Sequence, residues 1–166
     1  MEGDIDTLVN DFATSDAGRR STIIETLQDS SDPRVLSLFF KVLQNKSEAD
    51  FVRVEVLKGL PFRNDCVQTK QRFCEVVCCI LNDREDEELV RQYAALAMRY
   101  FVELQGVLGL LEGIVRDPGE EISVRYNALS SIERNADCSE CQSALRRLVS
   151  IPLLGKSAKR TLERLS

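Results

Sequence analysis

Apolar residues recur at intervals of three and four along almost the whole chain, the spacing that places them on one face of a helix. Short groups of Asp, Asn, Pro and Gly separate these apolar segments and mark turns. The pattern therefore predicts an all-α protein. The predicted helices span residues 4–13, 17–29, 32–45, 48–60, 67–82, 86–101, 103–116, 120–135, 138–150 and 155–165.

The chain also repeats itself. Segments 51–60, 89–98 and 123–132 align, and each carries Val-Arg followed by small or apolar residues three and seven places after the Arg. Weaker copies begin near either end of the chain. If the basic residue of each copy is taken as its anchor, successive anchors are 33, 38, 34 and 34 residues apart. A unit of that length filled by two helices predicts an α-solenoid of about five antiparallel hairpins, one domain over residues 1–166. The anchors are Arg20, Arg53, Arg91, Arg125 and Lys159.

The Asp32-Pro33 and Asp117-Pro118 helix entrances, the repeated Val-Arg and the Ala/Gly-Leu endings resemble HEAT-like repeats. The resemblance is to the short bacterial kind that also occurs in phycobilin lyases. It implies a superhelix in which the second helix of each hairpin lines a concave surface.

In the family that this chain resembles, an acidic residue six places before the Arg forms a ladder with the Arg of a neighbouring repeat. Here those places hold Ser47, Glu85 and Gly119. Eight places before the Arg, all three strong copies have a side chain with a carboxylate or amide oxygen. We expect the ladder to persist through a longer loop that uses Asn45, Asp83 and Asp117.

Each repeated Arg lies beside the apolar stripe of its helix, at the border of the predicted core. A partly buried guanidinium needs acceptors, and the acidic loops can supply them. We therefore interpret Arg53, Arg91 and Arg125 as bridges between the loops of adjacent repeats, and keep anion binding as the alternative.

The opposite side of the same helices carries apolar and aromatic residues surrounded by polar ones, a composition favoured at protein interfaces. We expect Tyr93, Leu96, Tyr126 and Val54 to be exposed there and to bind a protein partner. The alternative is that the Tyr and Leu side chains fill the seam between adjacent second helices. The predicted partner-binding residues are Val54, Glu55, Lys58, Gln92, Tyr93, Leu96, Tyr126 and Asn127.

The amino-acid composition excludes several kinds of functional site. The chain has no His, so it has neither a Ser-His nor a Cys-His catalytic pair and no imidazole metal ligand. The glycines of 105–113 lie inside a helical pattern and do not form a phosphate loop. We predict that the protein is not an enzyme and uses no cofactor, no metal and no small-molecule ligand.

Six cysteines raise the question of metal or redox chemistry. Cys74 and Cys78 share one face of an apolar helix, where buried free thiols are ordinary. Cys138 and Cys141 have the Cys-x-x-Cys spacing at a helix entrance, where a thiol pKa falls and a zinc site can begin. The spacing alone predicts structural thiols, because no strand-helix-strand pattern surrounds it.

Charge is uneven along the chain. The net charge is −5, which divides into +5 for residues 142–166 and −10 for residues 1–141. Residues 83–88 contain five acids, explained by solvation and by the preference for carboxylates at a helix N-terminus. The acidic body favours a basic protein partner over nucleic acid, and the basic end is an alternative contact for an acidic partner or RNA.

No apolar run is long enough to cross a membrane, and the acidic N-terminus lacks the features of a signal peptide. We expect a cytoplasmic protein without membrane contact. The predicted function is a non-catalytic protein-binding scaffold or adaptor, a description that includes bacterial immunity and regulatory proteins. The resemblance also implies the alternative of a phycobilin lyase-like protein that handles a chromophore, and a lesser similarity to helical-repeat DNA glycosylases implies nucleic-acid binding.

Overall fold

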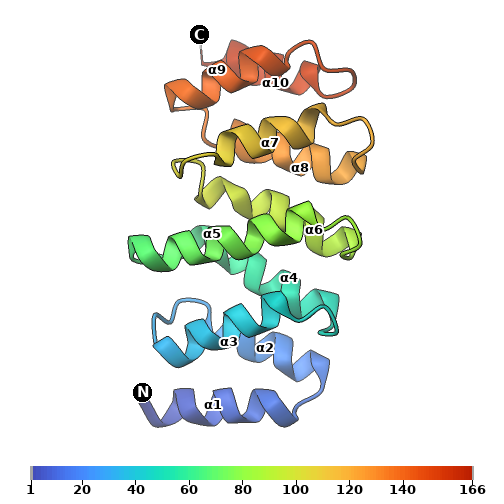
Figure 1. Ribbon diagram of the computed structural model, residues 1–166. Coiled ribbons are helices and arrows are strands. Elements are labelled where there is room, and N and C mark those ends of the chain that lie inside the picture. The colour runs from blue at the N-terminus through green and yellow to red at the C-terminus, as the bar shows by residue number, and fades with distance from the viewer. Residues whose placement is uncertain (1, 166) are drawn as a thin grey trace. The chain divides into compact units, whose positions relative to one another are not determined.

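The computed structural model describes the backbone of residues 2–165 and the side chains of residues 5–165. This part of the chain is all-helical, with ten α-helices, two short 3-10 helices and no strand (Figure 1). The α-helices are α1 (Glu2–Thr14), α2 (Ala17–Leu27), α3 (Pro33–Gln44), α4 (Asp50–Gly59), α5 (Val67–Asn82), α6 (Glu88–Ala97), α7 (Val107–Arg116), α8 (Ile122–Glu133), α9 (Ser139–Leu148) and α10 (Gly155–Arg164). The 3-10 helices are η1 (Leu60–Phe62) and η2 (Met98–Tyr100).

All ten predicted helices are confirmed, and the differences lie at their ends. The helices predicted to begin at residues 48, 86 and 120 begin two residues later, at 50, 88 and 122. The helix predicted from residue 103 begins at Val107, because Gly106 before it has φ 86°, in the left-handed region that glycine adopts without strain.

The chain forms two compact units, residues 1–90 and 91–166. In the first unit α1 packs on α2 and α3 on α4, while α1 contacts α3, α3 contacts α5 and α2 contacts α4. First helices and second helices of the hairpins therefore form separate layers. In the second unit α7 contacts α8 and α9, and α10 contacts α8 and α9. The single domain expected from the sequence stays a prediction.

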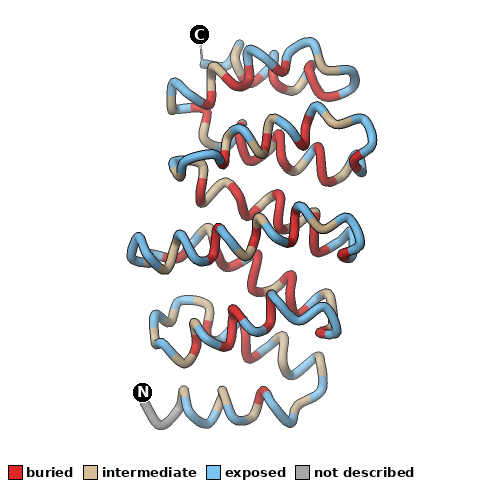
Figure 2. Tube along the Cα trace, viewed as in Figure 1, coloured by how far each residue is buried: buried red, intermediate tan, exposed pale blue. Residues whose placement is uncertain are grey.

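Each unit buries the apolar faces of its own helices, and exposed residues alternate with buried ones along every hairpin (Figure 2). In the first unit the rings of Phe40 and Phe73 stack with centroids 4.3 Å apart. Beside them the guanidinium of Arg63 lies 5.5 Å from the ring centroid of Phe39. Arg63 is itself buried, and its Nε and Nη2 donate to the carboxylate of Asp65.

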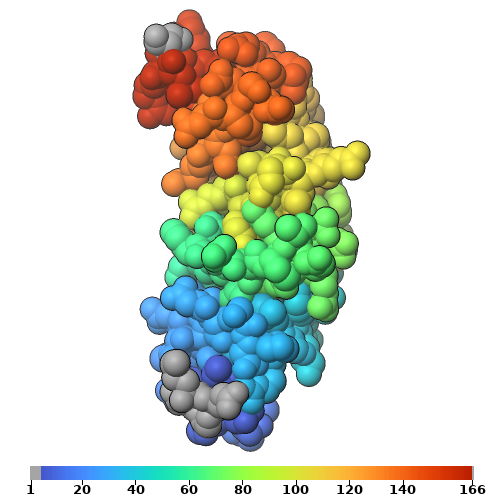
Figure 3. Space-filling model, turned by 90° about the vertical axis from the view of Figure 1, so that its left-hand side faces the viewer, coloured from blue at the N-terminus to red at the C-terminus, as the bar shows by residue number. Residues whose placement is uncertain are grey.

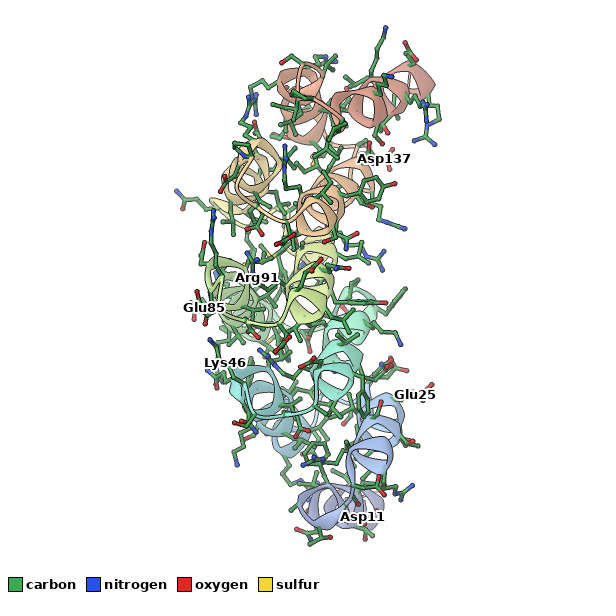
Figure 4. All side chains as sticks on the ribbon, turned by 90° about the vertical axis from the view of Figure 1, so that its right-hand side faces the viewer. Asp11, Glu25, Lys46, Glu85, Arg91 and Asp137 are labelled. Carbon is green, nitrogen blue, oxygen red and sulfur yellow. The ribbon has the colours of Figure 1, made fainter. Side chains whose placement is uncertain are left out.

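Three loops that join the first helix of a hairpin to the second have one construction. They span residues 45–49, 83–87 and 117–121. In each loop the first side chain accepts a hydrogen bond from the backbone N–H two residues later, which forms an Asx turn. The bonds run from Ser47 to Asn45 (3.1 Å), from Glu85 to Asp83 (3.1 Å) and from Gly119 to Asp117 (2.8 Å). Lys46 and Glu85 mark two of these loops, which lie on the same side of the first unit (Figure 4).

The fourth residue of each loop is a buried acid whose carboxylate accepts the N–H of the residue that follows. These bonds run from Ala49 to Glu48, from Glu87 to Asp86 and from Glu121 to Glu120. Each acid lies five places before the repeated Arg of its own hairpin. The turn therefore holds one buried carboxylate at a fixed place beside each of three helix starts.

The repeated arginines bind these carboxylates from the preceding hairpin. Arg53 donates through Nη1 and Nη2 to both oxygens of Asp86, at 2.6 and 2.7 Å, and also to the carbonyl of Leu43. Arg91, labelled in Figure 4, binds Glu120 in the same two-pronged way at 2.8 and 2.6 Å. The predicted role of these two arginines as bridges between loops is confirmed. A third, single contact joins Arg20 to Glu48 at 3.1 Å.

Two details of the predicted ladder are wrong. Its acids are not the residues eight places before the Arg, because those side chains are turned back into the Asx turns of their own loops. Arg125 also differs, since its Nε and Nη2 donate to the carbonyl of Val115 within its own hairpin, at 3.0 and 2.9 Å. At the place where the next acid would stand, five residues before Lys159, the chain has the apolar Leu154.

Removing one partner of a buried ion pair leaves the other charge buried and uncompensated. The Arg53 side chain is 1% exposed and that of Asp86 3% exposed, so Arg53→Met is expected to lower the free energy of unfolding by about 3–5 kcal/mol. The control is Lys159→Met, which removes a 3.8 Å pair with exposed Glu163 and is expected to cost less than about 1 kcal/mol. Urea unfolding measures the free energy of unfolding of both variants. An equal loss in the two would contradict the stabilising role of the Arg53–Asp86 pair. The double variant Arg53→Met/Asp86→Leu is expected to recover much of the loss.

The same pair predicts a pH dependence. Burial raises the pKa of Asp86, but the hydrogen bonds from Arg53 and from the N–H of Glu87, with nearby positive charge, outweigh it and hold the pKa below its usual value. The resulting stabilisation is complete above the unfolded pKa of about 3.9 and is lost as the pH falls through the lower folded value. The difference in unfolding free energy between wild type and Asp86→Asn should therefore shrink below about pH 4. Urea unfolding from pH 7 to pH 3 measures it, and a constant difference would refute the prediction.

Candidate functional site

The predicted partner-binding residues of the first unit lie on α4. Val54 is only 7% exposed, so the expectation that it is exposed is wrong. Plotted on a helical wheel of α4 alone, Val54 lies opposite the core of its own hairpin. In the structure α2 packs against α4 and covers that side. Val54 therefore contributes to the core between the two second helices.

Glu55 and Lys58, also on α4, are bound to each other and to α2. Lys58 Nζ donates to Glu55 Oε2 at 2.8 Å, and Gln28 Nε2 donates to Glu55 Oε1 at 3.0 Å. Gln28 follows the last residue of α2, so this small network ties the end of α2 to the middle of α4. Lys58 is exposed and Glu55 partly so, which leaves both accessible from solvent.

The remaining predicted residues lie in the second unit, on α6 and α8. Tyr126 is 54% exposed, the most open aromatic side chain of this unit's described residues. Tyr93 and Leu96 are partly exposed on α6. The expectation that large apolar side chains are accessible here is confirmed for Tyr126 and holds in part for the two on α6.

Polar side chains of α8 join these two helices. Asn127 Nδ2 donates to the carbonyl of Gln92, and the Ser131 hydroxyl donates to the carbonyls of Ala95 (2.7 Å) and Leu96 (3.0 Å). Just after the end of α8, Asn135 Nδ2 donates to the carbonyl of Arg99 in η2. The amide of Asn127 and the backbone of Gln92 are therefore used in packing α8 on α6, which fixes the surface that carries Tyr126.

Sequence reasoning missed one member of this surface. Ile122, the first residue of α8, is 49% exposed and lies four residues before Tyr126, so the two side chains are neighbours on one face of the helix. Only positions that follow the repeated Arg were considered as surface, whereas Ile122 lies three places before it. Extending the helical wheel backwards to the helix start would have found it.

Residues of the acidic cluster form ion pairs within the fold. In the run 83–88, Asp83 pairs with Lys46 and Asp86 with Arg53, so the run builds a loop and its entry to α6. Both pairs line a groove of about 390 Å³ between the ends of α3 and α5. Among the residues described, no group of three or more His, Cys, Asp or Glu side chains converges as a metal site.

At the basic end the cations are more open. Arg147 is held by Glu112 through two bonds of 3.0 and 2.5 Å, which lower the pKa of that carboxyl. Lys156, Lys159 and Arg160 are exposed on α10. The turn before α10 also presents Leu153 to solvent, with φ 69° and the N–H of Leu154 donating to the carbonyl of Pro152.

All six cysteines are free thiols. On α5 the sulfurs of Cys74 and Cys78 lie 4.0 Å apart, one buried and one partly exposed, as their shared helical face predicted. Cys66, before α5, is exposed, and a hydrogen bond with the hydroxyl of Thr69 lowers its pKa. Cys138 and Cys141 lie at the start of α9.

Comparison with known proteins identifies no relative. No family model matches the chain, and neither a curated protein nor a solved structure matches it. Within the described residues, none of the helices has the length and apolar character needed to cross a bilayer. The surface of α6 and α8 must therefore be interpreted from its own chemistry.

Burial assigns opposite roles to two residues that occupy the same repeat position. Val54→Ala removes two buried methyl groups and is expected to lower the free energy of unfolding by about 2 kcal/mol. Tyr126→Ala removes a half-exposed ring and is expected to cost less than about 1 kcal/mol. Chemical denaturation measures both. If Tyr126→Ala proves the more costly of the two, the ring belongs to the packing seam and is not a free surface.

Proposed function

We propose that the chain is a non-catalytic protein-binding module, and that Tyr126 and Ile122 of α8 with Tyr93 and Leu96 of α6 form its contact surface. We further propose that its hairpins form an α-solenoid similar to HEAT-like repeats, with second helices lining the binding face. The partner is a protein that offers an apolar pocket for the Tyr126 ring.

The exposure of Tyr126 is the observation that carries the proposal. Tyr is enriched among the residues that dominate binding energy, because it has a large apolar ring, only two side-chain torsions and a hydroxyl that can hydrogen-bond at the rim. A half-exposed Tyr beside a half-exposed Ile is an apolar area that is open to solvent. Covering that area by a partner releases water from both surfaces.

Rigidity supports the same proposal. The hydrogen bonds from Asn127 and Ser131 hold α8 against α6, so the contact residues keep their spacing before a partner arrives. A preorganised surface loses little conformational entropy on binding. The buried Arg91–Glu120 pair fixes the start of α8 next to the start of α6 and adds to this stiffness.

The solenoid part of the proposal is supported by the repeated loops. Three hairpins use the same turn and the same buried acid, and each of these acids accepts an Arg from the hairpin before it. A contact that passes from one hairpin to the next is the arrangement that repeat proteins use.

The test is an affinity capture from lysate of the source cells, with the wild type, Tyr93→Ala/Tyr126→Ala and the control Phe62→Ala as baits. Phe62 is 74% exposed on η1 and lies outside the proposed surface. We expect one protein to be retained by the wild type and by the control and to be reduced at least tenfold with the double variant, as the loss of two aromatic anchors implies.

Circular dichroism and unfolding curves must first show that all three baits are equally folded. Binding between the purified partner and each variant is then measured by calorimetry. Equal affinity of the wild type and the double variant would refute the proposed surface.

A further inference from the structure

Cys138 occupies the N-cap of α9, a position where Ser, Thr, Asp and Asn are preferred. Its backbone is extended, with φ −87° and ψ 142°, and its Sγ accepts the backbone N–H of Cys141 at 3.2 Å. The sulfur thus takes the place of a capping oxygen. This hydrogen bond holds the sulfur of Cys138 against the first turn of α9.

The two thiols of this pair differ in environment. Cys138 is partly exposed, whereas Cys141 is 0% exposed in the core of the second unit. Burial, together with the interaction with Cys138, raises the pKa of Cys141 to about 12. One sulfur is therefore accessible to a reagent in solution, and the other is sheltered three residues away on the first turn of the helix.

The spacing suits a disulfide. A helical separation of three residues places the two Cα atoms about 5 Å apart, inside the range that disulfides span. Because Cys138 lies outside the regular helix, its side chain can rotate toward Cys141 without breaking the i to i−4 bonds of α9. Cys74 and Cys78 lack this freedom, since both lie inside α5.

We propose that Cys138 and Cys141 form a redox-active dithiol that reacts with small disulfides of the glutathione class. The segment that carries Cys138 joins α8 to α9 and lies on the face shown in Figure 3, in orange. This chemistry is separate from the proposed binding surface and does not depend on it.

The reaction is a pair of exchanges. Cys138 loses its proton and attacks one sulfur of the small disulfide, whose S–S bond breaks, and the first small thiol leaves with that proton. Cys141 then gives up its proton and attacks Sγ of Cys138 in the mixed disulfide, and the second small thiol leaves with that proton. The protein dithiol is oxidised by two electrons, and the small disulfide is reduced to two thiols.

The experiment equilibrates the folded protein with glutathione and glutathione disulfide over a range of ratios, blocks free thiols by alkylation and maps the peptides by mass spectrometry. We expect Cys138 and Cys141 to lose alkylation together in one two-electron transition. Exposed Cys66 is the internal comparison, because it is expected to carry glutathione as a mixed disulfide that no neighbouring thiol resolves.

Two variants separate the steps. Cys141→Ser is expected to trap glutathione on Cys138, with at least a tenfold rise in that mixed disulfide over the wild type at the same ratio. Cys138→Ser keeps a capping oxygen and is expected to leave buried Cys141 fully alkylated after denaturing quench, without glutathione. Circular dichroism confirms that both variants retain the wild-type helix content.

Three results would overturn the proposal. The first is that both thiols stay reduced at ratios that modify Cys66. The second is that glutathione accumulates on Cys138 of the wild type without an internal disulfide, since Cys141 would then be unable to resolve it. The third is that Cys141→Ser shows no more glutathione on Cys138 than the wild type does.

Discussion

A guanidinium that is buried cannot shed its charge, so the fold must surround it with acceptors. Arg53 and Arg91 meet this constraint by taking both oxygens of a carboxylate that the next hairpin supplies. The carboxylate in turn must be held still, and the Asx turn of its loop does so. The matching construction of the loops 83–87 and 117–121 follows from this requirement.

The polar groups of the protein separate into those that build it and those that remain accessible. The buried ion pairs of Arg53 and Arg91 lie at the loops, where they join one hairpin to the next. Amide and hydroxyl groups of α8 bind carbonyls of α6, which removes them from the solvent side. Tyr126 and Ile122 have no comparable task in packing, and this division is the reason to assign them to recognition. It also explains why the acidic run 83–88, conspicuous in the sequence, supplies ion pairs within the fold.

The helices and the bridging role of Arg53 and Arg91 were predictable, because both depend on local spacing along one helix. Ten apolar stripes define ten helices, and an Arg at the border of a stripe needs a partner. The spacing could not predict which acid binds Arg53. Asp83 and Asp86 are both suitable, and only the conformation of the turn decides which of them faces inward. Val54 shows a second limit of prediction from sequence. A helical wheel describes one helix and contains no information on which other helix packs against it. The capping role of Cys138 was not predictable either, because it depends on the position of the N-cap of α9 to within one residue.

Each central hairpin carries an acceptor in the loop between its two helices and a donor five residues later, so a copied hairpin brings both halves of the bond with it. Such a cassette can be inserted by gene duplication without stranding a charge, because the incoming acid satisfies the Arg before it and the incoming Arg finds the acid after it. Leu154 ends this series, and Arg125 turns to the carbonyl of Val115 instead. The direction of the bond thus allows further copies of the central hairpins, whereas the last hairpin offers no acid to an incoming Arg.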